Sequence, residues 1–264
     1  MLQAGTSLTI NTHGQTLTNT NAAARPVSAG GITSSGSLAL NTGALNNAGG
    51  YVGAIGAITG STGQITNTVS NGAGGQIVGQ GGLNLSISGL NNQGGQLQNL
   101  AGITLNAGAG SIDNRQGLVR AGGDVTLAAA SINNSNTLGT NQGIEGNNVA
   151  LTATTLNNNL GAIRADNNAT IASSGTVNNN QGLMSAGGTL SLQDSASVKT
   201  LAVTNTAGTL IAGKNTNVNA ASLGGDGKVL SKNNLSIALT SDFTNSGEAP
   251  RVRQLPLQKS PLLQ

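Results

Sequence analysis

The chain has 264 residues, of which 7% are charged, against roughly 25% in an average globular protein. It contains 41 glycines, one tyrosine, one phenylalanine and no tryptophan, which excludes a thick core built on large aromatic side chains. Three of the 11 basic and one of the 8 acidic residues follow residue 247, so residues 1–247 are almost neutral and lack the clustered Lys and Arg of a nucleic-acid-binding surface. Cysteine is absent, which excludes disulfides and thiolate metal sites.

The first expected strand is SLTI at 7–10, and the single histidine, His13, follows it beside Gly14. This position is typical of a solvated turn rather than of a catalytic or metal-binding histidine. The start of the chain has no basic segment followed by an apolar run, and no stretch reaches the roughly 18 apolar residues of a membrane helix. We therefore expect no membrane insertion, and we expect any export signal to lie outside this chain.

Residues 1–80 predict irregular coils of a repeat. The stretch 19–36 is long between strand signals and contains Pro26, so we expect a protruding loop or a degenerate coil there. The strand SLAL at 37–40 follows it. Residues 53–80 also fit the repeat imperfectly, although GGQI at 74–77 matches GGQL at 94–97.

Residues 81–247 repeat more regularly. Short segments alternate apolar and polar residues with period 2, which predicts strands whose apolar residues point to one side. The second apolar residue of each segment marks the period, with spacings of 19 to 26 residues. These marker residues are Leu85, Leu105, Leu127, Leu151, Ile171, Leu192, Val218 and Ile237.

An apolar residue and an asparagine pair follow each marker in most units, as in LNN at 90–92, INN at 132–134 and VNN at 177–179. Asp113 replaces the first asparagine in IDN at 112–114. Because Asn and Gly tolerate the left-handed backbone conformation, these pairs predict corners between strands. We expect asparagines at equivalent corners to hydrogen-bond the coils above and below, as in cross-β ladders. Ligand binding by the pairs is the weaker alternative.

Residues 248–264 differ sharply from the repeats. They hold three of the four prolines and the basic residues Arg251, Arg253 and Lys259, and they contain no glycine. Because proline cannot donate a hydrogen bond to a strand ladder, the stack is expected to stop near residues 243–247. A disordered end is the main expectation for this tail, and a basic interaction tail is the alternative.

These patterns predict an all-β fold, a right-handed parallel β-helix with a period near 20–22 residues. About 11 coils would form a rod of roughly 50 Å, since neighbouring strands lie about 4.8 Å apart. A leucine-rich repeat would require helical periodicity, which is absent, and the sustained apolar period is evidence against disorder. Both ends of such a rod expose unpaired strand edges, so end-to-end self-association is also expected.

No catalytic, cofactor-binding or metal-binding residue is predicted. Asp113 and Asp124 lie eleven residues apart, about half a coil, which places them on different faces. An enzyme acting on polysaccharides would need a groove with several acidic and basic groups and aromatic platforms, and this composition disfavours it. LGGDGKVL at 223–230 is an isolated partial match to calcium-binding repeats, and the regular T-x-T array of an ice-binding face is absent.

The units combine an ITL-like strand, LNN or IDN, and then QGLV and AGGD. In this they resemble the haemagglutinin repeats of filamentous-haemagglutinin-type exoproteins, which are two-partner-secreted adhesins and contact-dependent growth-inhibition exoproteins of Gram-negative bacteria. The resemblance covers about 80–247 clearly and 1–80 loosely. The NPNG and VENN motifs of such exoproteins are absent, and Arg164-Ala165-Asp166 lacks the glycine of an Arg-Gly-Asp tripeptide.

The resemblance implies the fibrous shaft of a secreted or surface-displayed protein, carried through the outer membrane by a partner transporter. The expected function is a non-enzymatic structural or adhesive shaft that presents a binding or toxin module to a host or bacterial receptor or glycan. A stalk of a growth-inhibition toxin is the alternative, and a polysaccharide-active β-helix enzyme is a distant one. No adhesive residue follows from the resemblance.

Overall fold

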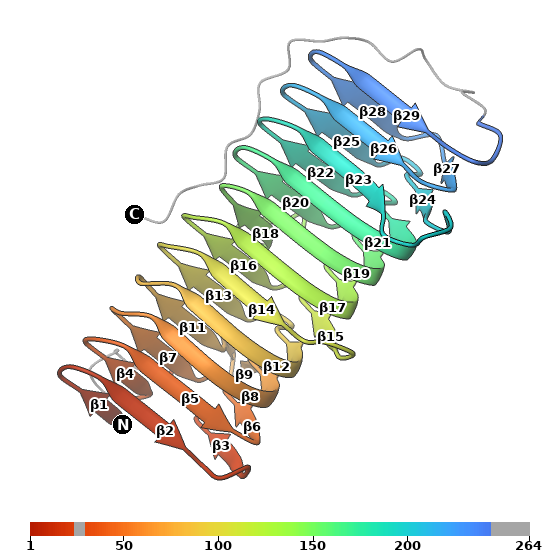
Figure 1. Cartoon of the computed structure of the whole chain (residues 1–264). Helices are drawn as coiled ribbons and strands as arrows, with labels where there is room; N and C mark the ends of the chain where they lie inside the picture. The colour runs from red at the N-terminus through yellow and green to blue at the C-terminus, as the bar shows by residue number, and fades with distance from the viewer. Residues whose placement is uncertain (24–29, 244–264) are drawn as a thin grey trace.

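The computed structural model describes residues 1–23 and 30–243, and it is an elongated β-solenoid (Figure 1). All strands of the described chain are stacked in parallel, except for one short hairpin. The coils wind in the right-handed sense that parallel crossovers almost always take (Figure 1). The predicted all-β parallel β-helix is therefore confirmed. Pro26 and the tail at 248–264 lie outside the described residues.

Each coil contributes one strand to an 11-stranded sheet, here called sheet 1. Its strands are β1 (Leu2–Ala4), β4 (Ile32–Ser34), β7 (Tyr51–Ala54), β11 (Gln76–Gly79), β13 (Gln96–Asn99), β16 (Leu118–Ala121), β18 (Gly143–Gly146), β20 (Ala162–Ala165), β22 (Leu183–Ala186), β25 (Thr209–Ala212) and β28 (Lys228–Ser231).

A 16-stranded sheet bends around the other two sides of the rod, which we call face 2 and face 3. Face 2 is formed by β2 (Leu8–Asn11), β5 (Leu38–Thr42), β8 (Ile58–Thr66), β12 (Leu83–Asn91), β14 (Ile103–Asn106), β17 (Val125–Asn133), β19 (Val149–Asn157), β21 (Ala169–Asn178), β23 (Leu190–Asp194), β26 (Thr216–Asn219) and β29 (Leu235–Ala238). Face 3 is formed by β3 (Thr16–Thr18), β6 (Ala44–Asn46), β15 (Ser111–Asp113), β24 (Ala202–Thr204), β27 (Ser222–Gly224) and the ends of β8, β12, β17, β19 and β21.

The long strands show that the corner between faces 2 and 3 is often made inside one continuous strand. The sequence predicted three short strands per unit separated by corners. In the middle of the rod, β12, β17, β19 and β21 instead run through that corner (Figure 1). Separate strands remain where extra residues intervene, as at 107–110 between β14 and β15 and at 195–201 between β23 and β24.

The core is a set of apolar rows that run along the rod axis. The marker row from Leu85 to Leu192 pairs residue by residue between coils, and none of its six side chains is more than 1% exposed. Gly60 occupies this row between Leu40 and Leu85. Its φ is +133°, and a Cβ there would lie 2.0 Å from the Leu40 carbonyl oxygen, so the coil requires glycine. Gly60 is one of the departures from the repeat within residues 53–80.

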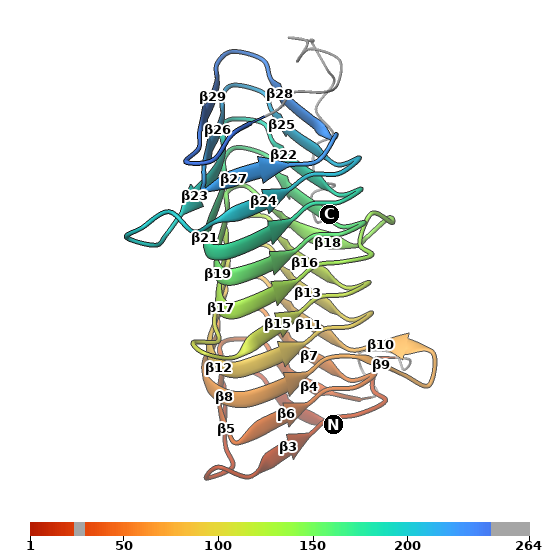
Figure 2. The same cartoon turned by 90° about the vertical axis from the view of Figure 1, so that its right-hand side faces the viewer.

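The solenoid has about nine turns, near but not equal to the predicted eleven coils. Nine turns carry an asparagine at one corner, from the half-buried Asn19 to the buried Asn205, whereas sheet 1 counts eleven strands. At the next corner after Asn205 the chain has Gly225. Residues 68–75 add an antiparallel hairpin, β9 (Val69–Ser70) and β10 (Ala73–Gly74), which projects from the rod (Figure 2).

Candidate functional site

The most extended polar feature of the described chain is a ladder of nine asparagines inside the corner between face 3 and sheet 1. In the first eight, Nδ2 donates to the Oδ1 of the asparagine one coil further on, at 2.7–2.8 Å, and Asn205 Nδ2 donates to the Lys228 carbonyl at 3.1 Å. The ladder consists of Asn19, Asn47, Asn67, Asn92, Asn114, Asn134, Asn158, Asn179 and Asn205. The expected asparagine ladder is thus confirmed.

The ladder uses the second asparagine of each LNN-type pair, which sequence alone did not specify. Asn134, with no exposed surface, donates to Asn158 Oδ1 at 2.8 Å and to the Ala162 carbonyl at 2.9 Å. It also accepts from Asn114 Nδ2 at 2.8 Å. A carboxamide is required here because it donates and accepts at the same time.

The first asparagine of each pair has a different role. Its Oδ1 accepts the backbone N–H two residues further on, as Asn133 does from Ser135 at 3.2 Å. Asp113 makes the same bond to the Arg115 N–H at 3.1 Å, and it also pairs with the Arg115 guanidinium at 2.7 Å. This position needs only an acceptor, which explains why aspartate can replace asparagine there.

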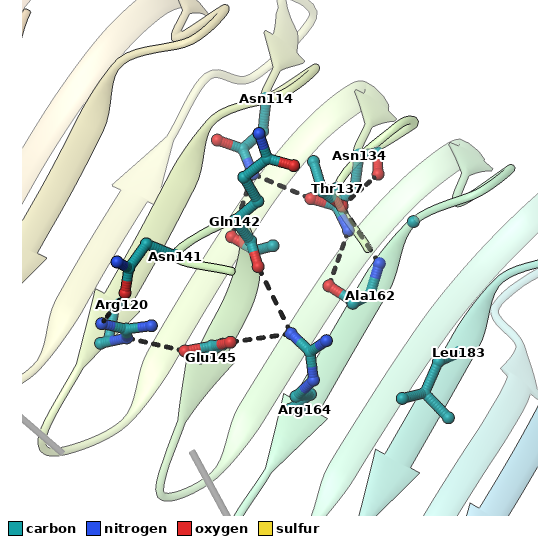
Figure 3. A network of polar contacts seen from close by, with 12 residues as sticks. Asn114, Arg120, Asn134, Thr137, Asn141, Gln142, Glu145, Ala162, Arg164 and Leu183 are labelled. Atoms are coloured by element: carbon teal, nitrogen blue, oxygen red, sulfur yellow. Dashed lines mark hydrogen bonds and ion pairs between the residues drawn. The ribbon is translucent and has the colours of Figure 1, made fainter. Parts of the chain in front are cut away.

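A second polar row lies on the outer side of sheet 1 and was not anticipated from the sequence. Arg120 on β16, Glu145 on β18 and Arg164 on β20 occupy equivalent register positions in three successive coils. Arg120 Nε lies 2.7 Å from Glu145 Oε2, and Arg164 Nη1 lies 2.8 Å from Glu145 Oε1 (Figure 3). Their side chains are 8%, 3% and 13% exposed, respectively. A buried charge row of this kind requires mutual pairing.

The Arg-Glu-Arg row holds the loop that leads into β18. Arg120 Nη1 donates to Asn141 Oδ1, and Arg164 Nη1 donates to the Gln142 carbonyl, both at 3.3 Å (Figure 3). Arg120 Nη2 is buried and has no hydrogen-bond partner among the described residues. The row could have been found by placing R, E and R of QGLVRAGG, QGIEG and GAIRA at the same offset in their units.

A third polar centre organises the loop between β23 and β24. The Asp194 carboxylate accepts backbone N–H groups of Leu201 at 2.6 Å, Ala196 at 2.9 Å and Thr200 at 2.5 Å. These hydrogen bonds, the one from Leu201 first, lower the pKa of Asp194. At the corner before β17, a hydrogen bond from Asn148 likewise lowers the pKa of Asp124. Both carboxylates thus stabilise loop backbone or corner amides.

The residues considered as candidates for chemistry are not brought together. His13 is exposed in a turn at φ 51°, as predicted. Asp113 lies on face 3, whereas Asp124 lies at the corner between sheet 1 and face 2, so the prediction that they occupy different faces is confirmed. Within residues 1–23 and 30–243, no group of three or more His, Cys, Asp or Glu side chains could hold a metal ion. No helix in these ranges could span a bilayer.

The outer surface of face 2 is regular and almost free of charge. In its described strands, Asp194 at the end of β23 is the one charged residue. The outward residues are Thr, Asn, Ser, Ala and Gln in mixed order, such as Thr104 and Asn106 on β14 and Thr126 and Ala128 on β17. This surface is mostly polar, and no single pair of side chains recurs in every coil.

Comparisons of the chain with protein-family models, with curated proteins and with solved structures each gave no match.

Proposed function

We propose that this protein is a structural shaft of a secreted or surface-displayed bacterial exoprotein. The observation that supports this most strongly is the continuous run of parallel coils with one ladder of asparagines from Asn19 to Asn205, buried from Asn47 onward. In a stacked repeat of this kind, each coil contacts its neighbours, so length is gained by adding coils. Polar groups of the described residues are used mainly to hold corners and loops, as the Asn and Asp contacts show.

The mechanism of such a shaft is mechanical. Ten inter-strand spacings separate β1 from β28, which corresponds to about 48 Å of rod. A module joined to one end is held at that distance from the surface that carries the other end. We further propose that an outer-membrane partner transporter exports the protein and that the presented module meets a host or bacterial receptor or glycan. A toxin stalk would use the same mechanics with a different module.

The test varies the length of the shaft while leaving its ends unchanged. The chain is displayed on a bacterial surface between an anchor and an unrelated binding module, and adhesion to beads that carry the module's target is measured. Deleting residues 83–102 removes one coil in register, because Leu83 pairs with Ile103, and it leaves the Arg-Glu-Arg row intact. Inserting four further copies of the same coil lengthens the rod by roughly 19 Å.

A shaft predicts that adhesion past a surface polymer brush rises with added coils and falls with the deletion. Adhesion that does not change with coil number would contradict the proposal. Saturable binding of the isolated chain to cells, lost on substitution of outward face 2 residues such as Thr104, would instead identify an adhesive face. Release of reducing sugars from polysaccharides by the purified chain would identify the enzyme alternative.

A further inference from the structure

Among the described residues, the strands at the two ends of the rod have a neighbour on one side only. At the N-terminal end β1, β2 and β3 each pair with one strand, and at the C-terminal end the same holds for β28 and β29. Within the described residues, the inward side chains of the first coil are also less covered than those of the second. Leu8, Ile10 and Leu17 are partly exposed, whereas Leu38, Leu40 and Leu45, one coil further on, are at most 1% exposed.

Along each end strand, the backbone N–H and C=O groups of alternate residues point away from the rod. The groups that do so at one end are in the positions needed to pair with those at the other end. The Leu8 N–H donates to the Ser37 carbonyl in the second coil, so the N–H and C=O of Thr9 point to the open end. At the other end, the carbonyls of Asn234 and Ala238 accept from the preceding coil, so the backbone groups of Leu235 and Ile237 point outward. Leu235 continues the inward row that begins at Leu8.

The side chains at the two ends also match. A depression of about 510 Å³ at the N-terminal end is lined by residues that include Leu2, Leu17, Asn19 and Ile32. Phe243, the one phenylalanine of the chain, is 48% exposed and follows the inward residue Leu223 by twenty residues, the length of one coil. Among described residues no donor reaches Asn19 Oδ1, although every later ladder asparagine accepts a hydrogen bond there. The N-terminal end therefore offers a depression lined by both polar and apolar residues, together with an unused acceptor.

We propose that the N-terminal end binds the C-terminal end of a second copy of this chain, head to tail and in register. In this arrangement β28 and β29 of one copy extend sheet 1 and face 2 of the next across the junction. Phe243 enters the N-terminal depression above Leu17. A translation along the rod axis is the arrangement that places every inward row over itself, and it leaves new ends that can bind further copies.

The chain has no cysteine, so single cysteines report the orientation without background. Gln3 begins the outward row of sheet 1 that ends at Leu230, and Thr9 begins the outward row of face 2 that ends at Ser236. In the proposed junction each of these pairs lies one strand spacing apart, within the Cα separation that a disulfide spans. The full-length variants Gln3→Cys and Leu230→Cys are purified, mixed and mildly oxidised.

A covalent dimer in the mixture, with far less in either variant alone, is the expected result. The pair Thr9→Cys with Ser236→Cys should behave in the same way, whereas the mismatched pair Gln3→Cys with Ser236→Cys should not crosslink. Dimers of Gln3→Cys alone would show head-to-head contact and overturn the proposal. Absence of dimers from both matched mixtures would overturn it too.

Sedimentation of the full chain provides an independent measurement. Thr9→Pro removes the N–H that points away from the N-terminal end of the rod, at an exposed edge position that tolerates proline. Thr9→Ala keeps that N–H. Parent and Thr9→Ala should form longer species as concentration rises, and Thr9→Pro should remain a monomer with an unchanged circular dichroism spectrum. Equal association of both variants, or a strictly monomeric parent at high concentration, would contradict the junction.

Discussion

The two asparagines of one INN corner should respond in opposite ways to the same isosteric change. Asn134 belongs to the buried ladder, whereas Asn133 caps a turn with its Oδ1 alone. Aspartate at 133 keeps the acceptor for the Ser135 N–H, as Asp113 does for Arg115 in the preceding coil. Aspartate at 134 removes both donors, so Asn158 Oδ1 loses its donor and the Ala162 carbonyl loses its side-chain hydrogen bond.

The magnitude follows from these two lost bonds. Leaving Asn158 Oδ1 without a partner costs about 1–3 kcal/mol and losing the hydrogen bond to Ala162 about 0.5–1.5 kcal/mol, so Asn134→Asp should lower the free energy of unfolding by about 1.5–4.5 kcal/mol at pH 7. Asn133→Asp should change it by less than about 1 kcal/mol. Burial among acceptors disfavours the carboxylate, so the folded-state pKa of the carboxyl group introduced by Asn134→Asp is raised above its unfolded value. The protonated acid can donate once, and part of the loss should therefore be regained as pH falls toward 4.

Urea unfolding of both variants and the parent, followed by far-ultraviolet circular dichroism at pH 7 and pH 4, measures these differences. The probe should be supplemented by hydrogen exchange at the coils around Asn134, because long repeats can unfold in parts. Equal losses for the two variants would refute the distinct roles of the asparagines. A loss for Asn134→Asp that does not shrink at pH 4 would refute the hydrogen-bond explanation of its cost.

Four further changes test other parts of the structure. Leu127→Asp buries an unpaired charge and should abolish the parent's melting transition, whereas Thr126→Asp on the exposed side of the same strand should leave it nearly unchanged. Identical melting of Leu127→Asp and the parent would refute the inward placement of Leu127. Glu145→Gln leaves Arg120 and Arg164 without their counter-charge and should cost about 3–5 kcal/mol in urea unfolding, against under about 0.5 kcal/mol for the exposed Lys232→Gln. Leu160 has φ 51° at a corner where Gly49 and Gly94 stand in other coils, so Leu160→Gly should raise the melting temperature and the free energy of unfolding, the latter by about 0.5–1 kcal/mol. A lower melting temperature than the parent's would show that the partly exposed Leu160 side chain stabilises the fold by more than its backbone strain costs. The lowered pKa of Asp194 means that its stabilisation of the loop at 195–201 is present above the unfolded value near 3.9 and is lost as pH falls through the folded value. The protection factors of the Thr200 and Leu201 amides against hydrogen exchange should therefore fall in acid in the parent, and they should be low at every pH in Asp194→Asn.

The repeat itself could be predicted because two simple physical requirements act on every coil. An inward row must be apolar, so Leu85, Leu105 and Leu127 recur at one strand position, and corners require residues that tolerate a left-handed backbone or cap a turn. The same period predicted parallel ladders of coils and the asparagine ladder between them. Composition alone indicated a thin aliphatic core.

The tertiary structure decided what depends on contacts between coils. Which asparagine of a pair enters the ladder depends on the corner geometry, because Asn133 and Asn134 are chemically identical neighbours. Arg120, Glu145 and Arg164 become one buried row when insertions of different length bring their strands into register, and their unequal separations of 25 and 19 residues show this only after the units are aligned. The requirement for glycine at Gly60 likewise comes from a carbonyl in the neighbouring coil. Local pattern fixes the period of the solenoid because each strand and corner is a local structure, whereas burial and pairing are properties of coils that lie far apart in sequence and adjacent in space.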